Sequence, residues 1–104
     1  MRIYVAMIEV LRMLRGELPR IERFDNDLAR QLRRAAASVA LNIGEGSGSS
    51  GGVRTQRYRT ALGSARETGA CLDVAVALGY LDDVDTALRA KLDLVIGGLV
   101  RLTV

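Results

Sequence analysis

Arginine is the residue type in this sequence with the clearest capacity for chemistry. The chain of 104 residues has 15 basic side chains, and all but one of them are arginines. A guanidinium group forms two parallel hydrogen bonds to one phosphate or carboxylate, so this bias favours recognition of such anions. A GC-rich genome would produce the same bias, and this explanation is kept as the alternative.

The basic side chains are concentrated in the first part of the chain. Residues 1–60 carry 11 basic and 6 acidic groups, a net charge of +5, whereas residues 61–104 carry 4 and 6, a net charge of −2. We predict that the first part binds the sugar-phosphate backbone of RNA or DNA by charge, without reading bases. The alternative is a solvated face held by salt bridges between helices. The predicted nucleic-acid-binding residues are Arg12, Arg15, Arg30, Arg33, Arg34, Arg54 and Arg57.

Side chains for catalysis and metal binding are scarce. The chain has no histidine, the usual general base and the commonest metal ligand, and Cys71 is its single cysteine. Ser-His-Asp, Cys-His and most zinc arrangements are therefore excluded. Three closely spaced aspartates do not fit a calcium-binding loop and are predicted to cap a helix; they are Asp82, Asp83 and Asp85. Asp73 is predicted to pair with an arginine. We predict no enzymatic activity, no catalytic residue, no metal and no cofactor.

Glycine and serine dominate residues 44–52, GEGSGSSGG. Residues 46–51 match G-x-G-x-x-G, the pattern of dinucleotide-binding sites, but a helical pattern precedes them and no βαβ unit surrounds them. A nucleotide P-loop is also excluded, because no Gly-Lys-Ser/Thr sequence follows. We predict a flexible connection between two helices. A weak anion site at the backbone amides that start the next helix is the alternative.

Apolar residues recur at alternating spacings of three and four in four segments, the period of amphipathic helices. We predict helices over residues 2–17, 26–44, 53–79 and 84–103, in a single domain of residues 1–104. Short connections between four helices predict an all-α fold, an antiparallel up-and-down four-helix bundle.

Particular residues are predicted to delimit and pack these helices. Pro19 is predicted to end the first helix. The second is capped by Asp25 or Asp27, and the fourth by Asp83 or Asp85. Small residues are predicted to let the second and third helices approach closely; they are Ala35, Ala36, Ala65 and Gly69.

Two predicted helices carry apolar residues on a second face, opposite the core stripe. In a bundle this small, such a face is expected to be covered by another subunit. The alternative is a set of scattered surface aliphatics without function. The predicted oligomer-interface residues are Val5, Ile8, Val74, Leu78 and Leu81.

The sequence also bears on the compartment. The N-terminal residues lack the pattern of a signal peptide, and no stretch is long and apolar enough to span a bilayer. A single cysteine excludes an intramolecular disulfide. We predict a cytoplasmic protein without membrane association.

Three motifs resemble the signature of the ribosomal S23 family of four-helix bundle proteins. They are residues 33–48, RRAAASVALNIGEGSG, residues 61–67, ALGSARE, and residues 78–81, LGYL. Members are encoded within intervening sequences of bacterial 23S ribosomal RNA genes or stand alone, and are similar to the accessory variability proteins of diversity-generating retroelements. The resemblance implies a homopentameric ring, association with RNA or with a reverse transcriptase, and no catalytic activity.

The motif residues are interpreted as structural more than ligand-binding. We expect Asn42 and Glu45 to bond the loop backbone or the third helix, and Gly63 and Ser64 to permit close helix contact. The family usually has a basic residue after G-S-G, where this chain has Ser49, which weakens the idea of a phosphate-binding loop. The residues carried over are Asn42, Glu45, Gly46, Ser47, Gly48, Gly63, Ser64, Glu67, Gly79 and Tyr80.

Two functional hypotheses follow. The first is a non-enzymatic oligomeric adaptor that binds nucleic acid, with structured RNA favoured, through its arginine-rich surface. The second is a protein-interaction scaffold whose ring docks a partner, such as a reverse transcriptase or a ribosome-associated protein, without binding nucleic acid directly.

Overall fold

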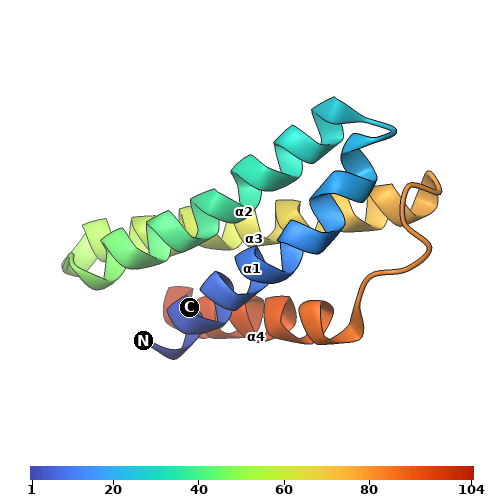
Figure 1. The fold of residues 1–104 in the computed structure, drawn as a ribbon. Helices are drawn as coiled ribbons and strands as arrows, with labels where there is room; N and C mark the ends of the chain where they lie inside the picture. The colour runs from blue at the N-terminus through green and yellow to red at the C-terminus, as the bar shows by residue number, and fades with distance from the viewer.

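A computed structural model describes residues 1–104 and contains four α-helices and no strand. Consecutive helices run in opposite directions, so both termini lie at the same end of the molecule (Figure 1). This arrangement confirms the predicted all-α four-helix bundle. The helices are α1 (Arg2–Glu22), α2 (Asn26–Ser47), α3 (Gly51–Ala77) and α4 (Thr86–Thr103).

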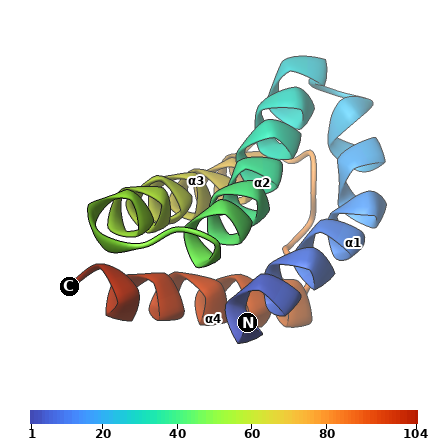
Figure 2. The same ribbon diagram turned by 90° about the vertical axis from the view of Figure 1, so that its left-hand side faces the viewer.

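Each helix packs against the next one in the chain, and α1 also packs against α4, which closes the bundle. In Figure 2, α1 lies beside α2 and crosses α4 near its own N-terminus. The most extensive interface joins α2 and α3. Small buried side chains make this close approach possible, as predicted for Ala35, Ala36 and Ala65. Gly69 instead faces Leu92 of α4.

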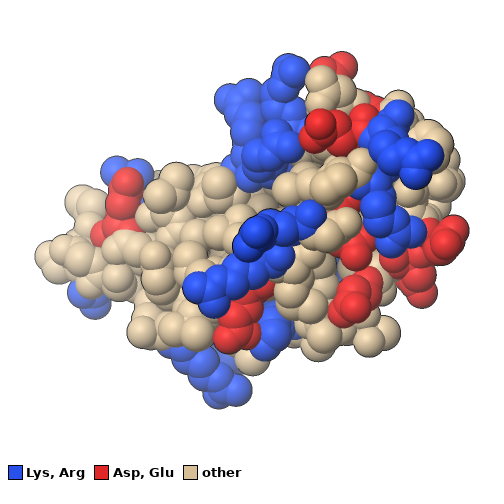
Figure 3. Space-filling view, in the orientation of Figure 1, with Lys and Arg blue, Asp and Glu red and all other residues tan.

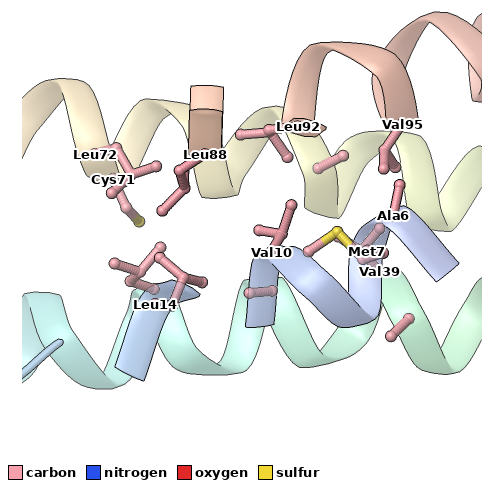
Figure 4. Close-up of a cluster of buried hydrophobic side chains, with 14 of the residues drawn as sticks. Ala6, Met7, Val10, Leu14, Val39, Cys71, Leu72, Leu88, Leu92 and Val95 are labelled. Carbon is pink, nitrogen blue, oxygen red and sulfur yellow. The ribbon is translucent and has the colours of Figure 1, made fainter. Parts of the chain in front are cut away.

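The core is one continuous cluster of 24 buried residues from all four helices. Met7, Val10 and Leu14 form the buried stripe of α1, at the spacing of an amphipathic helix. Figure 4 shows Leu14 facing Cys71, Leu72 and Leu88, which come from α3 and α4. The single cysteine is therefore a small apolar core residue, as expected.

Aspartates cap α2 and α4. Asp25 is the N-cap of α2, and its Oδ1 accepts a hydrogen bond of 2.9 Å from the backbone N–H of Leu28. Asp85 is the N-cap of α4 and accepts from the N–H groups of Ala87 and Leu88. These bonds satisfy N–H groups that have no partner inside the helix. Of each pair of candidate caps, Asp25 and Asp85 are the ones used.

The prediction that Pro19 ends the first helix is wrong. Helix α1 continues to Glu22 with Pro19 inside it, although proline has no N–H to donate. Ile21 is fully buried beyond the proline. The Ile21 carbonyl also accepts from the N–H groups of Phe24 and Asp25 at 3.0 and 2.9 Å. Burial and these hydrogen bonds hold the last turn in place.

The prediction of a flexible loop over residues 44–52 is also wrong, because α2 extends through Ser47 and α3 begins at Gly51. Only residues 48–50 connect the two helices. The Ser47 hydroxyl donates to the Gly44 carbonyl and the Ser49 hydroxyl to the Glu45 carbonyl, which satisfies acceptors at the end of α2. At the other end of the bundle, the connection between α3 and α4 spans residues 78–85, which is longer than predicted.

Candidate nucleic-acid interface

All seven arginines predicted to bind nucleic acid are exposed, and they lie on α1, α2 and α3. In Figure 3, basic side chains gather over α2 and over the middle of α1, and acidic and basic side chains lie together toward the end that carries the α3–α4 connection.

Three of these arginines form ion pairs, two of which join different helices. In each pair both side chains are at least 48% exposed, so water competes strongly for the charges. Exposed pairs of this kind contribute about 0–1 kcal/mol, so a phosphate could displace the carboxylates. The pairs are Arg30–Asp27 at 3.9 Å, Arg33–Glu22 at 3.3 Å and Arg57–Glu45 at 2.9 Å.

The other four arginines have no carboxylate partner within 4.0 Å. The Nε–H of Arg54 donates to the Ser49 carbonyl at 2.8 Å, which holds Arg54 against the short connection. No hydrogen bond holds the guanidinium groups of Arg12, Arg15 and Arg34. The free cations of the predicted surface therefore lie on α1 and α2.

A groove of about 500 Å³ runs between α2 and α3, and Arg30 and Arg34 are among its lining residues. We call it the polar groove, since seven of its eight lining residues are polar or charged. Arginines come from α2 and an acidic residue comes from α3, so both charges face the same space. The lining residues are Asp27, Arg30, Gln31, Arg34, Ala35, Ser38, Ser64 and Glu67.

Two serines form a bridge between the helices in the polar groove. The hydroxyls of Ser38 on α2 and Ser64 on α3 lie 2.9 Å apart. The Asn42 Nδ2 donates to the Ser38 carbonyl at 2.9 Å and to its hydroxyl at 3.1 Å. Sequence reasoning missed this groove, because the helical period places each serine on its helix but does not say which faces of two helices meet.

A second groove, of about 430 Å³, lies between α1 and α2, and we call it the apolar groove. Six of its eight lining residues are hydrophobic. Leu41 is 65% exposed, and Val5 on the adjacent surface is 55% exposed. The lining residues are Tyr4, Ile8, Leu11, Ala37, Ala40, Leu41, Gly44 and Glu45.

Four of the five predicted interface residues reach the surface. Val5, Val74 and Leu78 are exposed, and Ile8 is half-buried at the apolar groove. The prediction is wrong for Leu81, which is 1% exposed and belongs to the core. Helix α3 ends at Ala77, and the chain then turns, so the helical period no longer applies to Leu81.

The sequence of this chain matches, over residues 4–99, the family described as 23S rRNA-intervening sequence protein. The chain belongs to the 23S rRNA-intervening sequence protein family. Its fold is similar to the crystal structure of a protein of unknown function from the S23 ribosomal protein family of Bacteroides thetaiotaomicron, with a TM-score of 0.82 and 14% identity over 97% of each chain. No curated protein matches the sequence significantly.

In this family member, the motif residues at the end of α2 make contacts within the bundle. A Cβ at Gly46 would lie 2.6 Å from Cε1 of Tyr58, so α2 and α3 approach too closely there for any side chain. Glu45 binds Arg57 of α3, as expected. Asn42 bonds only its own helix, through Ser38, so its expected bond to the loop or to α3 is absent.

The motif residues of α3 have different roles from one another. Ser64 contacts α2, as expected, but Gly63 is exposed and nothing lies within 4 Å of a Cβ placed there. The expected close contact at Gly63 is therefore wrong. Glu67 accepts a long hydrogen bond of 3.5 Å from Gln31 of α2. Both Ser64 and Glu67 line the polar groove.

The third motif, residues 78–81, packs the α3–α4 connection against the turn between α1 and α2. Gly79 has φ +80°, a conformation that favours glycine. The Tyr80 ring stacks on Phe24 with centroids 5.5 Å apart, and its hydroxyl donates to Asp25 at 3.3 Å. Desolvation, the charge of Asp25 and this hydrogen bond all raise the pKa of Tyr80.

Two further predictions concern side chains away from the grooves. Asp73 pairs with Arg89 of α4 at 2.6 Å, which confirms that it binds an arginine. Burial, and secondly the charge of Glu67, raise the pKa of the Cys71 thiol, so it stays protonated near neutral pH.

None of the four helices combines the length and the apolar character needed to cross a membrane.

Proposed function

We propose that this protein is a non-enzymatic adaptor of the cytoplasm that binds RNA or other nucleic acid by charge. The observation that carries the proposal is the presence of Arg12, Arg15 and Arg34, three exposed guanidinium groups without a protein partner, beside arginines whose ion pairs are exposed and weak. Such a surface suits a phosphate backbone and reads no bases. The name of the family makes ribosomal RNA the natural first probe.

We propose further that the adaptor is a homo-oligomer, with a pentameric ring favoured by the family resemblance. One copy offers two apolar faces at opposite ends of the bundle, the apolar groove and the exposed Val74 and Leu78 of the α3 end. Two different faces suit a head-to-tail contact, which generates a closed ring when the rotation closes. A second copy is therefore the proposed occupant of the apolar groove.

The proposal is tested by the salt dependence of binding. Replacing Arg12, Arg15 and Arg34 together by alanine is expected to weaken binding to a 23S ribosomal RNA fragment. The slope of log affinity against log salt should fall by roughly 2–3, because each phosphate contact contributes about 0.7–0.9 to the slope. Filter binding over a salt series measures both quantities.

A matched triple variant controls for net charge. Arg2, Arg66 and Arg101 are also exposed and unpaired, and their replacement by alanine removes the same three charges from other places. The control should keep most of the affinity. Equal losses in the two variants would point to net charge alone, and no binding by the wild type at low salt would reject the proposed function.

A protein-interaction scaffold is the second candidate. The exposed apolar groove supports it, because monomeric proteins rarely leave a large contiguous apolar patch uncovered. In that case a reverse transcriptase or a ribosome-associated protein would be the partner, and affinity for that partner would change little with salt. Such a result, together with a failure to bind RNA, would favour the scaffold.

A further inference from the structure

The polar groove combines groups that binding to phosphate alone does not require. Its volume of about 500 Å³ lies within the range of small-molecule sites, about 300–1,000 Å³. Helix α2 supplies the cations Arg30 and Arg34, α3 supplies the carboxylate of Glu67, and a serine from each helix lies between them. A lining of this kind suits a ligand with one anionic part and one hydroxyl-bearing part.

The two arginines on the α2 side of the polar groove are available to bind an anion. Arg34 has no ion pair, and the partner of Arg30 is Asp27, at 3.9 Å and with a side chain that is 93% exposed. Arg30 and Arg34 are one helical turn apart, so they lie on one face of α2. Two guanidinium groups at this spacing can donate to the same phosphate.

The serine pair adds one further donor. The two hydroxyls have two protons, and one of these lies in the hydrogen bond between Ser38 and Ser64. Asn42 donates to the Ser38 hydroxyl, so it uses no hydroxyl proton. Whichever serine donates to the other, one proton has no acceptor in the protein, and it can bond a phosphate oxygen.

The α3 side of the polar groove, which carries Glu67, favours a hydroxyl group of the ligand. Glu67 is exposed, and its only hydrogen bond is the long one from Gln31 at 3.5 Å. An ionised carboxylate accepts hydrogen bonds and donates none, so it repels a phosphate and attracts an O–H group. The 2′-hydroxyl is the group that distinguishes RNA from DNA, and it can donate such a bond.

We infer that the polar groove binds one ribonucleotide unit of an RNA strand, with the phosphate at Arg30, Arg34 and the serine pair, and the 2′-hydroxyl at Glu67. This inference rests on the proposed function and makes it specific for RNA over DNA. The arginines supply affinity for either polynucleotide, and Glu67 supplies the preference between them.

Three oligonucleotides of equal length test the inference: an oligouridine, its deoxy counterpart and its 2′-O-methyl counterpart, which keeps the oxygen but lacks the proton. By fluorescence anisotropy at low salt, the wild type should bind the oligouridine about 3- to 10-fold more tightly than the other two. Glu67→Ala should abolish this preference, because only the oligouridine complex loses a hydrogen bond, whereas the loss of the negative charge acts on all three complexes alike. Arg34→Ala should weaken all three complexes equally and lower the salt slope by about 0.7.

Two control variants remove the same charges elsewhere. Asp82 and Arg59 are exposed and have no side-chain hydrogen bond or ion pair, so Asp82→Ala and Arg59→Ala match the charge changes and should keep the preference. Equal affinity of the wild type for the three oligonucleotides, or an equal loss of all three affinities in Glu67→Ala, would overturn the inference and leave the proposed function standing. If the wild type binds none of them and no ribosomal RNA, the proposed function itself fails.

Discussion

Helix α2 separates two grooves of similar size and opposite chemistry. The polar groove on its α3 side has a volume of about 500 Å³, and the apolar groove on its α1 side about 430 Å³. Charged and hydroxyl-bearing side chains line the first, whereas alanine, leucine, isoleucine and tyrosine dominate the second. The chemistry of the lining, and not the volume, decides which partner each groove fits.

The two linings come from two stripes of one helix. Arg30, Arg34 and Ser38 are four residues apart and face α3, whereas Ala37 and Leu41 are four apart and face α1. The two faces are distinct, so a second copy of the chain and an RNA strand can bind to α2 at the same time. A ring of copies would then repeat the polar groove, and the repeated sites would act together on one RNA.

The comparison predicts first that assembly depends on the apolar groove and not on the polar groove. Leu41→Asp places a charge on its most exposed apolar side chain, at 65% exposure. A contact between copies would then have to bury an unpaired carboxylate. We expect the oligomer to dissociate into a monomer of 11.2 kDa, measured by light scattering after size-exclusion chromatography.

Gln31→Asp introduces the same negative charge in the polar groove and is the control, which should keep the oligomeric mass. Loss of the ring should also lower affinity for a long RNA by roughly 10²–10⁴-fold, because linked sites no longer bind together. A wild type that is already monomeric, or a Gln31→Asp variant that dissociates equally, would contradict the division between the grooves.

The second prediction concerns the close contact between the end of α2 and the ring of Tyr58 on α3. Gly46→Ala would place a Cβ 2.6 Å from Cε1 of the buried Tyr58, so the ring or a helix must move. Overpacking of this kind costs about 1–3 kcal/mol of the free energy of unfolding. Thermal unfolding should show a Tm lower by several degrees, since about 1 kcal/mol shifts the Tm of such a domain by roughly 4–8 °C.

Gly16 provides the control for this substitution. It lies exposed within α1, and nothing lies within 4 Å of a Cβ placed there. Gly16→Ala should therefore stabilise the protein by about 0.5–1 kcal/mol through helix propensity alone. If Gly46→Ala raised the Tm by a similar amount, α2 and α3 would not be in the close contact described above.

Local signals predicted much of this fold. The alternating spacing of three and four between apolar residues predicts the four helices. Asp25 and Asp85 each lie just before such a segment, which is the position of a helix cap, and both are N-caps in the structure. The boundaries that failed depend on contacts from elsewhere in the chain. Helix α1 continues past Pro19 because Ile21 is buried by the bundle. The helix-breaking propensity of proline is a local property and carries no information about this burial.

The site was less predictable than the fold. The arginines were placed correctly on exposed faces, because exposure follows from the helical period. The prediction for Leu81 is wrong because the helical period does not continue through the turn at Gly79, where φ is +80°. The polar groove depends on Ser38 meeting Ser64, 26 residues apart, and such a register between helices is fixed by packing of the whole bundle.

The smallest predicted effect tests this register directly. Ser38→Ala and Ser64→Ala, singly and together, should give a coupling energy of about 0.5–1.5 kcal/mol in urea unfolding, the net contribution of one hydrogen bond. Ser47 and Ser49 form the control pair, because each hydroxyl bonds a carbonyl of α2 and neither contacts the other, so their effects should be additive. Additive effects for Ser38 and Ser64 as well would mean that the two hydroxyls do not bond each other across the polar groove, and the single free hydroxyl proton assigned to the ribonucleotide site would then lose its basis.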